Sequence, residues 1–241
     1  GYRVQQGLYP ILEPFDLKGV GALGQRYTES TKQDDSWLYL PSLRRVRRLS
    51  TAQRSDALFG QDTDVDSYYG YAGHIAWMDW KYLGEQDLLS VQHAQHFPAK
   101  WHDKVDWAFD EVWEKRRVYV VEGISKLPQY AYSKRVLYID KENWGIPYSD
   151  IYDRSGELWK IWINDITYRK SVPGNGAITY PDERPFAPAI VMVDMQLEHA
   201  TKASLPSPRF PGEQGWYYHQ GEKAGVTDDW FTVAALVAAG H

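Results

Sequence analysis

The stretch of residues 135–165 constrains the fold more than any other part of the chain, because it has the pattern of three strands in succession. The expected strands are residues 135–140, 148–152 and 158–163. Two short connections separate them, and connections this short join antiparallel neighbours. In the second connection, residues 153–156, an Asp can bond to its own backbone and a Gly supplies a positive φ. The stretch therefore predicts an antiparallel meander.

Hydrophobic side chains occupy both faces of the third expected strand. Successive side chains of a strand point to opposite faces, which places Trp159, Ile161 and Ile163 on one face. The same alternation places Lys160 and Trp162 on the other face. A sheet with large apolar groups on both faces is expected to have apolar material on each side.

Other segments extend this all-β pattern. Residues 117–124 are rich in Val and Tyr and predict another strand. Residues 190–199 alternate and predict a strand that runs through Met195 and Leu197, and residues 171–188 are expected to form a loop. A helix is expected to close the chain, with Thr227 as its N-cap and Gly240 at its C-terminal end.

Length and composition bound the possible functions. The chain has 241 residues, and a single domain over residues 1–241 is the simplest expectation because no internal repeat is evident. The net charge of −5 gives no electrostatic reason to expect nucleic acid as a partner. The absence of Cys excludes disulfides, thiolate metal sites and Cys nucleophiles. The apolar run of residues 233–239 is too short to span a bilayer.

Residues 19–24 match the GxGxxG pattern of dinucleotide-binding loops. That use requires a strand before the motif, a helix after it and an acid about 20 residues further on. Pro14 interrupts the strand, residues 25–35 lack a helical period, and residues 39–44 contain no acid. The pattern therefore favours a glycine-rich curved strand, and no nucleotide cofactor is expected.

Residues 93–106 gather side-chain types that bind transition metals. The set is His93, His96, His102, Asp103 and Asp106. Its spacing fits neither a metalloprotease helix nor a zinc finger, so solvated loop residues are the favoured interpretation and no metal is expected. The alternative is an enzyme that uses this cluster on a hydrophobic substrate.

The densest charge cluster is basic, although the chain is acidic overall. It consists of Arg44, Arg45, Arg47 and Arg48, in a segment of residues 37–49 that is expected to be a bent strand or a helical turn. Charge runs are usually solvated faces that protect a sheet edge. In a strand, however, one pair of these arginines would point inward, and an inward arginine needs an anion. The head group of a ligand is one such anion, so the four arginines are candidate ligand-binding residues.

Aromatic residues are frequent, with 11 Trp and 18 Tyr. Both types are amphipathic and are favoured in strands. Trp80, Trp144, Trp159 and Trp162 are candidates for the wall of an apolar ligand groove. An ordinary aromatic core is the alternative, and the sequence leaves both interpretations open.

Three stretches resemble a known bacterial family. They are WLYLPSLRRVRRLSTAQRSDALFG from Trp37, DWKYLGEQDLL from Asp79, and RVLYIDKENWGIPYSDIYDRSGELWK from Arg135. Over about residues 15–236 the chain resembles a family of unknown function called outer-membrane lipoprotein-sorting-protein-like, which is similar in plan to the LolA/LolB superfamily of periplasmic lipid and lipoprotein carriers. The resemblance implies a curved antiparallel half-barrel around an apolar cavity lidded by helices. It also implies a longer protein of which this chain is the C-terminal part, and Gly1 in place of an initiator Met agrees with that.

We therefore expect a mainly β protein with a few helices that carries a lipid, a lipoprotein acyl chain or another hydrophobic molecule without covalent chemistry. The resemblance implies a location in the periplasm of a Gram-negative bacterium, with a membrane transporter as a partner. Two alternatives stay open: an enzyme that acts on a hydrophobic substrate, and a structural subunit whose aromatic surface docks on an envelope complex. A bound metal would favour the first, and a large flat apolar patch would favour the second.

Overall fold

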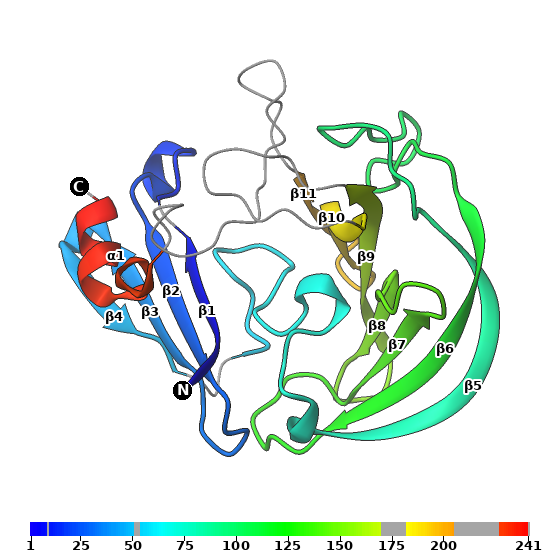
Figure 1. The fold of residues 1–241 in the computed structure, drawn as a ribbon, viewed down its shortest axis with the longest axis horizontal. Coiled ribbons are helices and arrows are strands. Elements are labelled where there is room, and N and C mark those ends of the chain that lie inside the picture. The colour runs from blue at the N-terminus through cyan, green and yellow to red at the C-terminus, as the bar shows by residue number, and fades with distance from the viewer. Residues whose placement is uncertain (9, 51–53, 170–181, 205–226, 241) are drawn as a thin grey trace. The chain divides into compact units, whose positions relative to one another are not determined.

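The computed structural model describes residues 1–240 except residues 9, 51–53, 170–181 and 205–226. These residues form two compact units (Figure 1). The described part of the first unit consists of residues 1–50 and 227–240, and that of the second consists of residues 54–169 and 182–204. No helix in these ranges is long and apolar enough to cross a membrane. The expectation of a single domain stays a prediction.

The first unit is a four-stranded antiparallel sheet with a short helix against it. The strands lie in chain order: β1 (Tyr2–Leu8), β2 (Gly21–Tyr27), β3 (Asp35–Leu40) and β4 (Arg45–Arg48). The short 3-10 turns are η1 (Phe15–Leu17), η2 (Pro41–Leu43) and η6 (Asp228–Phe231). The helix α1 (Val233–Ala239) buries Leu236 against Leu23 and Tyr39. It ends at Gly240, where a Cβ would lie 2.2 Å from the Tyr39 ring, so glycine permits this close approach.

Two expectations about this unit are confirmed in outline. Gly19 has a φ of +80° and Gly21 begins β2, which is the predicted glycine-rich strand. The closing helix is present, but the prediction that Thr227 caps it is wrong. The cap is Thr232, whose Oγ1 accepts a hydrogen bond from the backbone N–H of Ala235 at 3.1 Å. The residues between these two threonines form the 3-10 turn η6 instead of helix.

The second unit is a seven-stranded antiparallel sheet in which each strand pairs with its neighbours in the chain, in the order β11-β10-β9-β8-β7-β6-β5. The strands are β5 (Met78–Ser90), β6 (Glu114–Ser125), β7 (Lys134–Asp140), β8 (Tyr148–Tyr152), β9 (Leu158–Arg169), β10 (Arg184–Asp194) and β11 (His199–Ser204). Two 3-10 turns, η3 (Tyr68–Gly70) and η4 (Ile75–Trp77), precede β5. The predicted meander is confirmed as β7, β8 and β9, and the strand expected at residues 117–124 is part of β6.

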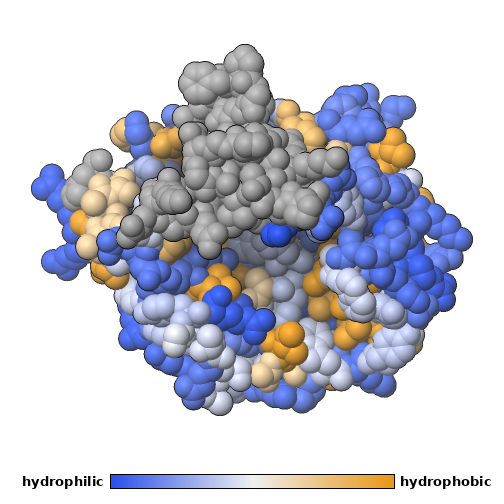
Figure 2. All heavy atoms as spheres, viewed as in Figure 1, coloured by the Kyte–Doolittle hydropathy of each residue, from blue (hydrophilic) through white to orange (hydrophobic). Residues whose placement is uncertain are grey.

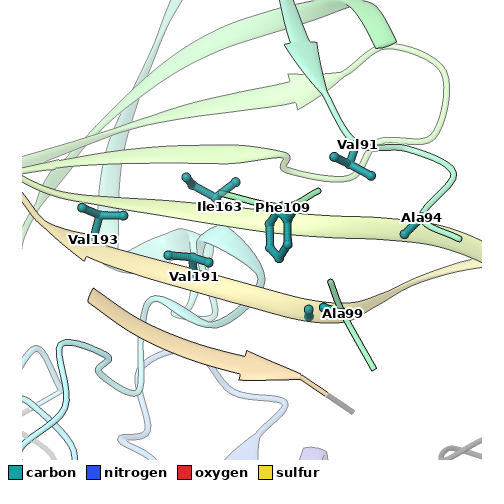
Figure 3. Close-up of a cluster of buried hydrophobic side chains, with 8 residues drawn as sticks. Val91, Ala94, Ala99, Phe109, Ile163, Val191 and Val193 are labelled. Carbon is teal, nitrogen blue, oxygen red and sulfur yellow. The ribbon is translucent and has the colours of Figure 1, made fainter. Parts of the chain in front are cut away.

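The seven-stranded sheet has two faces of different character. The outer face, defined by Ile161 and Ile163, carries a hydrophobic core that includes Val191 and Val193 of β10. Figure 3 shows these side chains from adjacent strands gathered around Phe109 of the segment 91–113. This core holds the segment against the outer face.

The inner face, defined by Lys160 and Trp162, is covered by the segment 54–77. Figure 1 shows this segment within the curve of the sheet. Trp162 is completely buried there, and its ring lies 5.5 Å from that of Tyr68. Met192 and Ile151 from the neighbouring strands complete the apolar part of this face.

Trp159 departs from the alternation expected for β9. The pairing of β8 with β9 shifts register between Ile151 and Tyr152, which leaves Trp159 as the extra residue of a bulge. Its ring packs against Tyr132, and its Nε1 donates to Asp194 Oδ2 at 2.9 Å. Both contacts belong to the inner-face cluster, so the placement of Trp159 with Ile161 was wrong.

The strand predicted over residues 190–199 is also interrupted. It ends at Asp194, and β11 begins at His199. The Oδ1 of Asp194 accepts hydrogen bonds from the backbone N–H groups of Gln196 and Leu197, which closes a turn. Leu197 is therefore 72% exposed instead of lying in line with Val193. The loop predicted over residues 171–188 overlaps β10 from Arg184 onward, and residues 171–181 lie outside the described residues.

Candidate functional site

An apolar pocket of about 680 Å³ lies on the outer face of the seven-stranded sheet. Small-molecule sites in proteins typically measure about 300–1,000 Å³. Strands β5, β7, β8 and β9 contribute Gln86, Leu88, Leu89, Tyr138, Tyr148, Asp150, Ile161 and Ile163. The segment 91–113 contributes Val105, Trp107, Ala108 and Trp113. The pocket is thus formed between a rigid sheet and one covering segment.

Backbone hydrogen bonds position this covering segment. Ala94 donates to the carbonyl of Ile166 on β9 at 2.9 Å, and Ile166 donates back to Val91. Trp113 Nε1 donates to the carbonyl of Phe109 at 3.3 Å, which orients its indole. Trp107 remains 40% exposed, so this side of the pocket is open to solvent.

Few polar groups reach into the pocket. Tyr138 OH donates to Asp150 Oδ2 at 2.7 Å, and Tyr148 OH donates to the carbonyl of Leu89 at 2.7 Å. Burial raises the pKa of Asp150, and the hydrogen bond from Tyr138 opposes that shift. Burial also raises the pKa of Tyr148 to about 12. None of the described residues that line the pocket is basic.

The four candidate arginines lie in the first unit, and none of them lines this pocket. The segment 37–49 is a hairpin and not one bent strand, because β3 and β4 pair antiparallel with Trp37 opposite Arg48. Arg44 precedes β4 and has a left-handed backbone with a φ of 49°. All four arginines are exposed, and Arg48 pairs with Asp35. Their role toward an anionic head group stays a prediction.

Three of the four candidate tryptophans come together on the inner face of the seven-stranded sheet. Trp162 is in the buried cluster there, and Trp80 and Trp159 pack against it. Trp144 is 69% exposed in the turn between β7 and β8. None of the four lines the outer-face pocket. The three tryptophans of the inner face match the aromatic core that the sequence left as the alternative, and Trp144 does not. A role of the four in ligand binding stays a prediction.

The histidine cluster is spread over the segment 91–113, and each of its histidines contacts a different acid. His93 Nδ1 lies 2.7 Å from Glu114 Oε1, and His96 Nδ1 lies 2.9 Å from Glu111 Oε1. Within the described residues, no group of three or more His, Cys, Asp or Glu side chains is arranged to hold a metal ion.

A buried network of charges links the segment 54–77 to the inner face. Arg135 is completely buried and donates to Ser67 Oγ at 3.0 Å, and its Nη2 lies 3.6 Å from Asp64 Oδ1. Lys160 Nζ donates to the carbonyl of Asp62 at 2.7 Å. Burial lowers the pKa of Lys160, although nearby carboxylates oppose that shift. These contacts fasten the segment over the inner face, since an unpaired buried charge would be very costly.

Asp165 on β9 is also buried, but unlike the charges of that network it has no hydrogen-bond partner in the described part of the chain. Both of its carboxylate oxygens are buried and have no hydrogen-bond partner among the described residues. Burial, with a smaller contribution from the charge of Glu111, raises its pKa to about 8. Asp165 is therefore largely protonated at neutral pH.

Three solved structures share the mainly β fold of this chain. An outer membrane lipoprotein-sorting protein domain from Vibrio parahaemolyticus, so described provisionally, is 21% identical with a TM-score of 0.64 over 95% of this chain and 75% of that chain. A DUF1329 family protein from Desulfovibrio piger is 18% identical with a TM-score of 0.64, over 94% and 75% of the two chains. A LolA superfamily protein from Nitrosomonas europaea is 16% identical with a TM-score of 0.50, over 94% and 76%.

Family membership follows from the sequence itself. The chain belongs to the family described as protein of unknown function (DUF1329), whose model matches residues 3–236. A search of curated proteins gives no significant match. The family that the sequence was expected to resemble, and its mainly β fold, are thereby confirmed.

Sequence reasoning missed the pocket residues, and the reason is physical. Trp107 and Trp113 lie in a segment without periodicity, where no alternation shows which way a side chain points. Asp150 and Tyr148 could have been found, because they are two residues apart on β8 and therefore share a face of the sheet with Ile161 and Ile163.

Proposed function

We propose that this protein is a non-enzymatic carrier that binds a hydrophobic or amphiphilic molecule, such as a lipid or a lipoprotein acyl chain, in the outer-face pocket. The observation that carries the proposal is the pocket itself, because about 680 Å³ of space is lined mainly by Leu, Ile, Val and Trp side chains. Burial of an acyl chain stabilises a complex by roughly 0.8 kcal/mol per CH₂. Such a site binds by partition and requires no chemical step.

We further propose a location in the periplasm of a Gram-negative bacterium, for which the LolA-like fold of the solved neighbours is the support. Release of the cargo to a membrane transporter is part of the proposal, but the fold does not address it. The provisional description of the Vibrio parahaemolyticus structure as a lipoprotein-sorting protein domain agrees with this role. On the face drawn in Figure 2, the described hydrophobic side chains form separate patches among hydrophilic ones. That face therefore lends no support to the alternative of a subunit that docks through one large apolar surface.

Quenching of tryptophan fluorescence by a brominated fatty alcohol tests the proposal, because Trp107 and Trp113 line the pocket. We expect saturable quenching in the parent protein and loss of most of it in the variant Trp107→Phe/Trp113→Phe. The matched control is Trp144→Phe, which removes an exposed indole away from the pocket. Absence of saturable quenching, or equal quenching in all three proteins, would contradict the proposal.

A second measurement identifies the natural cargo. Native mass spectrometry of the purified protein, followed by solvent extraction, should reveal a co-purified lipid or other hydrophobic molecule. A bound species that survives dialysis and disappears in the double tryptophan variant would assign the cargo to this pocket.

A further inference from the structure

The outer-face pocket has one ionisable acid at its floor. Asp150 lies on β8 between Val136 of β7 and Ile161 of β9, which are its Cα partners in the sheet. Its side chain is only partly accessible, and burial disfavours the charged form of such a group. The described residues that line the pocket include no Lys, Arg or His that could neutralise it from within.

The two tyrosine hydroxyls beside Asp150 have both donated their protons. The single proton of Tyr138 OH is used on Asp150 Oδ2, and that of Tyr148 OH is used on the carbonyl of Leu89. The second carboxylate oxygen of Asp150 receives no hydrogen bond from the described residues and is not sealed from solvent. A ligand group that pairs with this oxygen of the ionised carboxylate must therefore donate a hydrogen bond.

Aromatic rings strengthen the preference for a cation. Tyr138 and Tyr148 face each other across β7 and β8 with ring centroids 6.4 Å apart and perpendicular planes. Trp107 and Trp113 line the same pocket. The face of an aromatic ring attracts a cation, and carboxylate and rings together attract it more than either group alone.

From this geometry we infer that the pocket selects an amphiphile with a protonated amine, whose ammonium group pairs with Asp150 while its aliphatic chain contacts Leu88, Ile161 and Ile163. This inference rests on the proposed function and specifies its ligand class. It opposes the expectation from sequence that arginines select an anionic head group, because the arginines lie in the other unit. A neutral alcohol of the same chain length fills the apolar part and leaves the carboxylate without a cation.

A matched series of C12 ligands tests the inference, with each ligand kept below the concentration at which it forms micelles. The probes are dodecylamine, dodecanol and dodecanoate, and calorimetry on the parent protein measures their affinities at pH 7. We expect dodecylamine to bind about tenfold or more tighter than dodecanol, and dodecanoate to bind weakest. This comparison needs no variant and therefore does not depend on whether a substitution disturbs folding.

Asp150→Asn then assigns the selectivity to one residue. It should reduce the affinity for dodecylamine to that for dodecanol and leave dodecanol unchanged. The control is Glu157→Gln, which removes one negative charge at an exposed position outside the pocket and should change nothing.

The outcomes separate the two proposals. If dodecanol and dodecylamine bind the pocket equally, or if Asp150→Asn keeps the preference for the amine, the inference is wrong and the carrier function stands. If no C12 ligand binds and no pocket tryptophan is quenched by a brominated ligand, the carrier function itself fails.

Discussion

The two faces of the seven-stranded sheet use opposite means of covering a β surface. The inner face is closed by a segment that carries charges, and Arg135 and Lys160 are held there by partners on that segment. The outer face is covered by the segment 91–113, which contacts the sheet mainly through apolar side chains and leaves a pocket beside it. Buried charges require partners in good geometry because their desolvation is costly, whereas the apolar side chains beside the pocket require no polar partner. The difference assigns stability and specificity of packing to the inner face, and it leaves the outer face as the place of the proposed ligand site.

The largest expected effect is on the inner face. Arg135→Met removes a completely buried guanidinium and leaves the acid of Asp64 in place, so the free energy of unfolding should fall by about 3–5 kcal/mol. Arg117→Met is the control, because Arg117 is half exposed and pairs with Glu85 and Asp87 on the surface. Its effect should stay below about 1 kcal/mol. Urea unfolding measures both, and equal effects would contradict the assignment of stability to the inner face.

Replacement of a buried aspartate by asparagine should raise the free energy of unfolding at Asp165 and lower it at Asp140. Asp165 has a raised pKa of about 8, because it is buried without a partner and near Glu111. The unfolded chain releases its proton near pH 4, so the folded state binds more protons between pH 4 and pH 8. Its carboxylate therefore reduces stability progressively over that window as the pH rises. Asp165→Asn should raise the free energy of unfolding at pH 8 by roughly 2–4 kcal/mol.

Asp140 supplies the contrasting case on the same sheet. Burial would raise its pKa, but the Arg116 guanidinium and the backbone N–H groups of Asn143 and Glu142 hold the pKa below its ordinary value. Asp140→Asn should lower the free energy of unfolding at pH 7 by about 2–4 kcal/mol, and the loss should shrink toward pH 3. Thermal unfolding from pH 3 to pH 9 separates the two variants. The pairing argument fails if both variants change stability in the same direction.

A smaller effect is expected for ligand affinity at the pocket wall. Trp107→Ala should weaken the binding of dodecanol about tenfold, because it removes a large apolar surface from the open side of the pocket. Trp144→Ala removes a more exposed indole from a turn that does not line the pocket and should change the affinity by less than about twofold. Calorimetric titration compares them, and equal losses would show that dodecanol binds elsewhere.

The sequence was sufficient to predict the meander because its signals are local. In the turn after β8, Gly156 has a φ of +87° and Asp153 Oδ1 accepts from the backbone N–H groups of Ser155 and Glu157, as the sequence indicates. The bulge at Trp159 could not be predicted in this way, since it depends on the register of two strands and changes the face of one side chain. Alternation alone therefore assigned this tryptophan to the wrong face.

The pocket was beyond prediction for a related reason. A site formed between a sheet and an irregular segment brings together residues that are far apart in the sequence, such as Trp107 and Tyr138, and no periodic pattern records this. Charge density, by contrast, is visible in the sequence, and it made the arginine run a candidate for ligand binding. Its density says nothing about which sheet it joins, and the structure places it in the first unit.

The smallest expected effect concerns that arginine run, and it decides between the two ideas about the head group. Arg45→Ala/Arg47→Ala and Arg44→Ala/Arg48→Ala remove exposed charges that do not line the pocket, and exposed charges contribute little to binding. Each double variant should therefore change the affinity for dodecanoate by less than about twofold at physiological salt. The affinity for the neutral methyl ester should change equally little. If one pair weakens dodecanoate binding tenfold and spares the ester, an arginine contacts an anionic head group directly. That result would overturn the selection of amines by Asp150, because a site that pairs a carboxylate ligand with arginine cannot at the same time use Asp150 as its main partner.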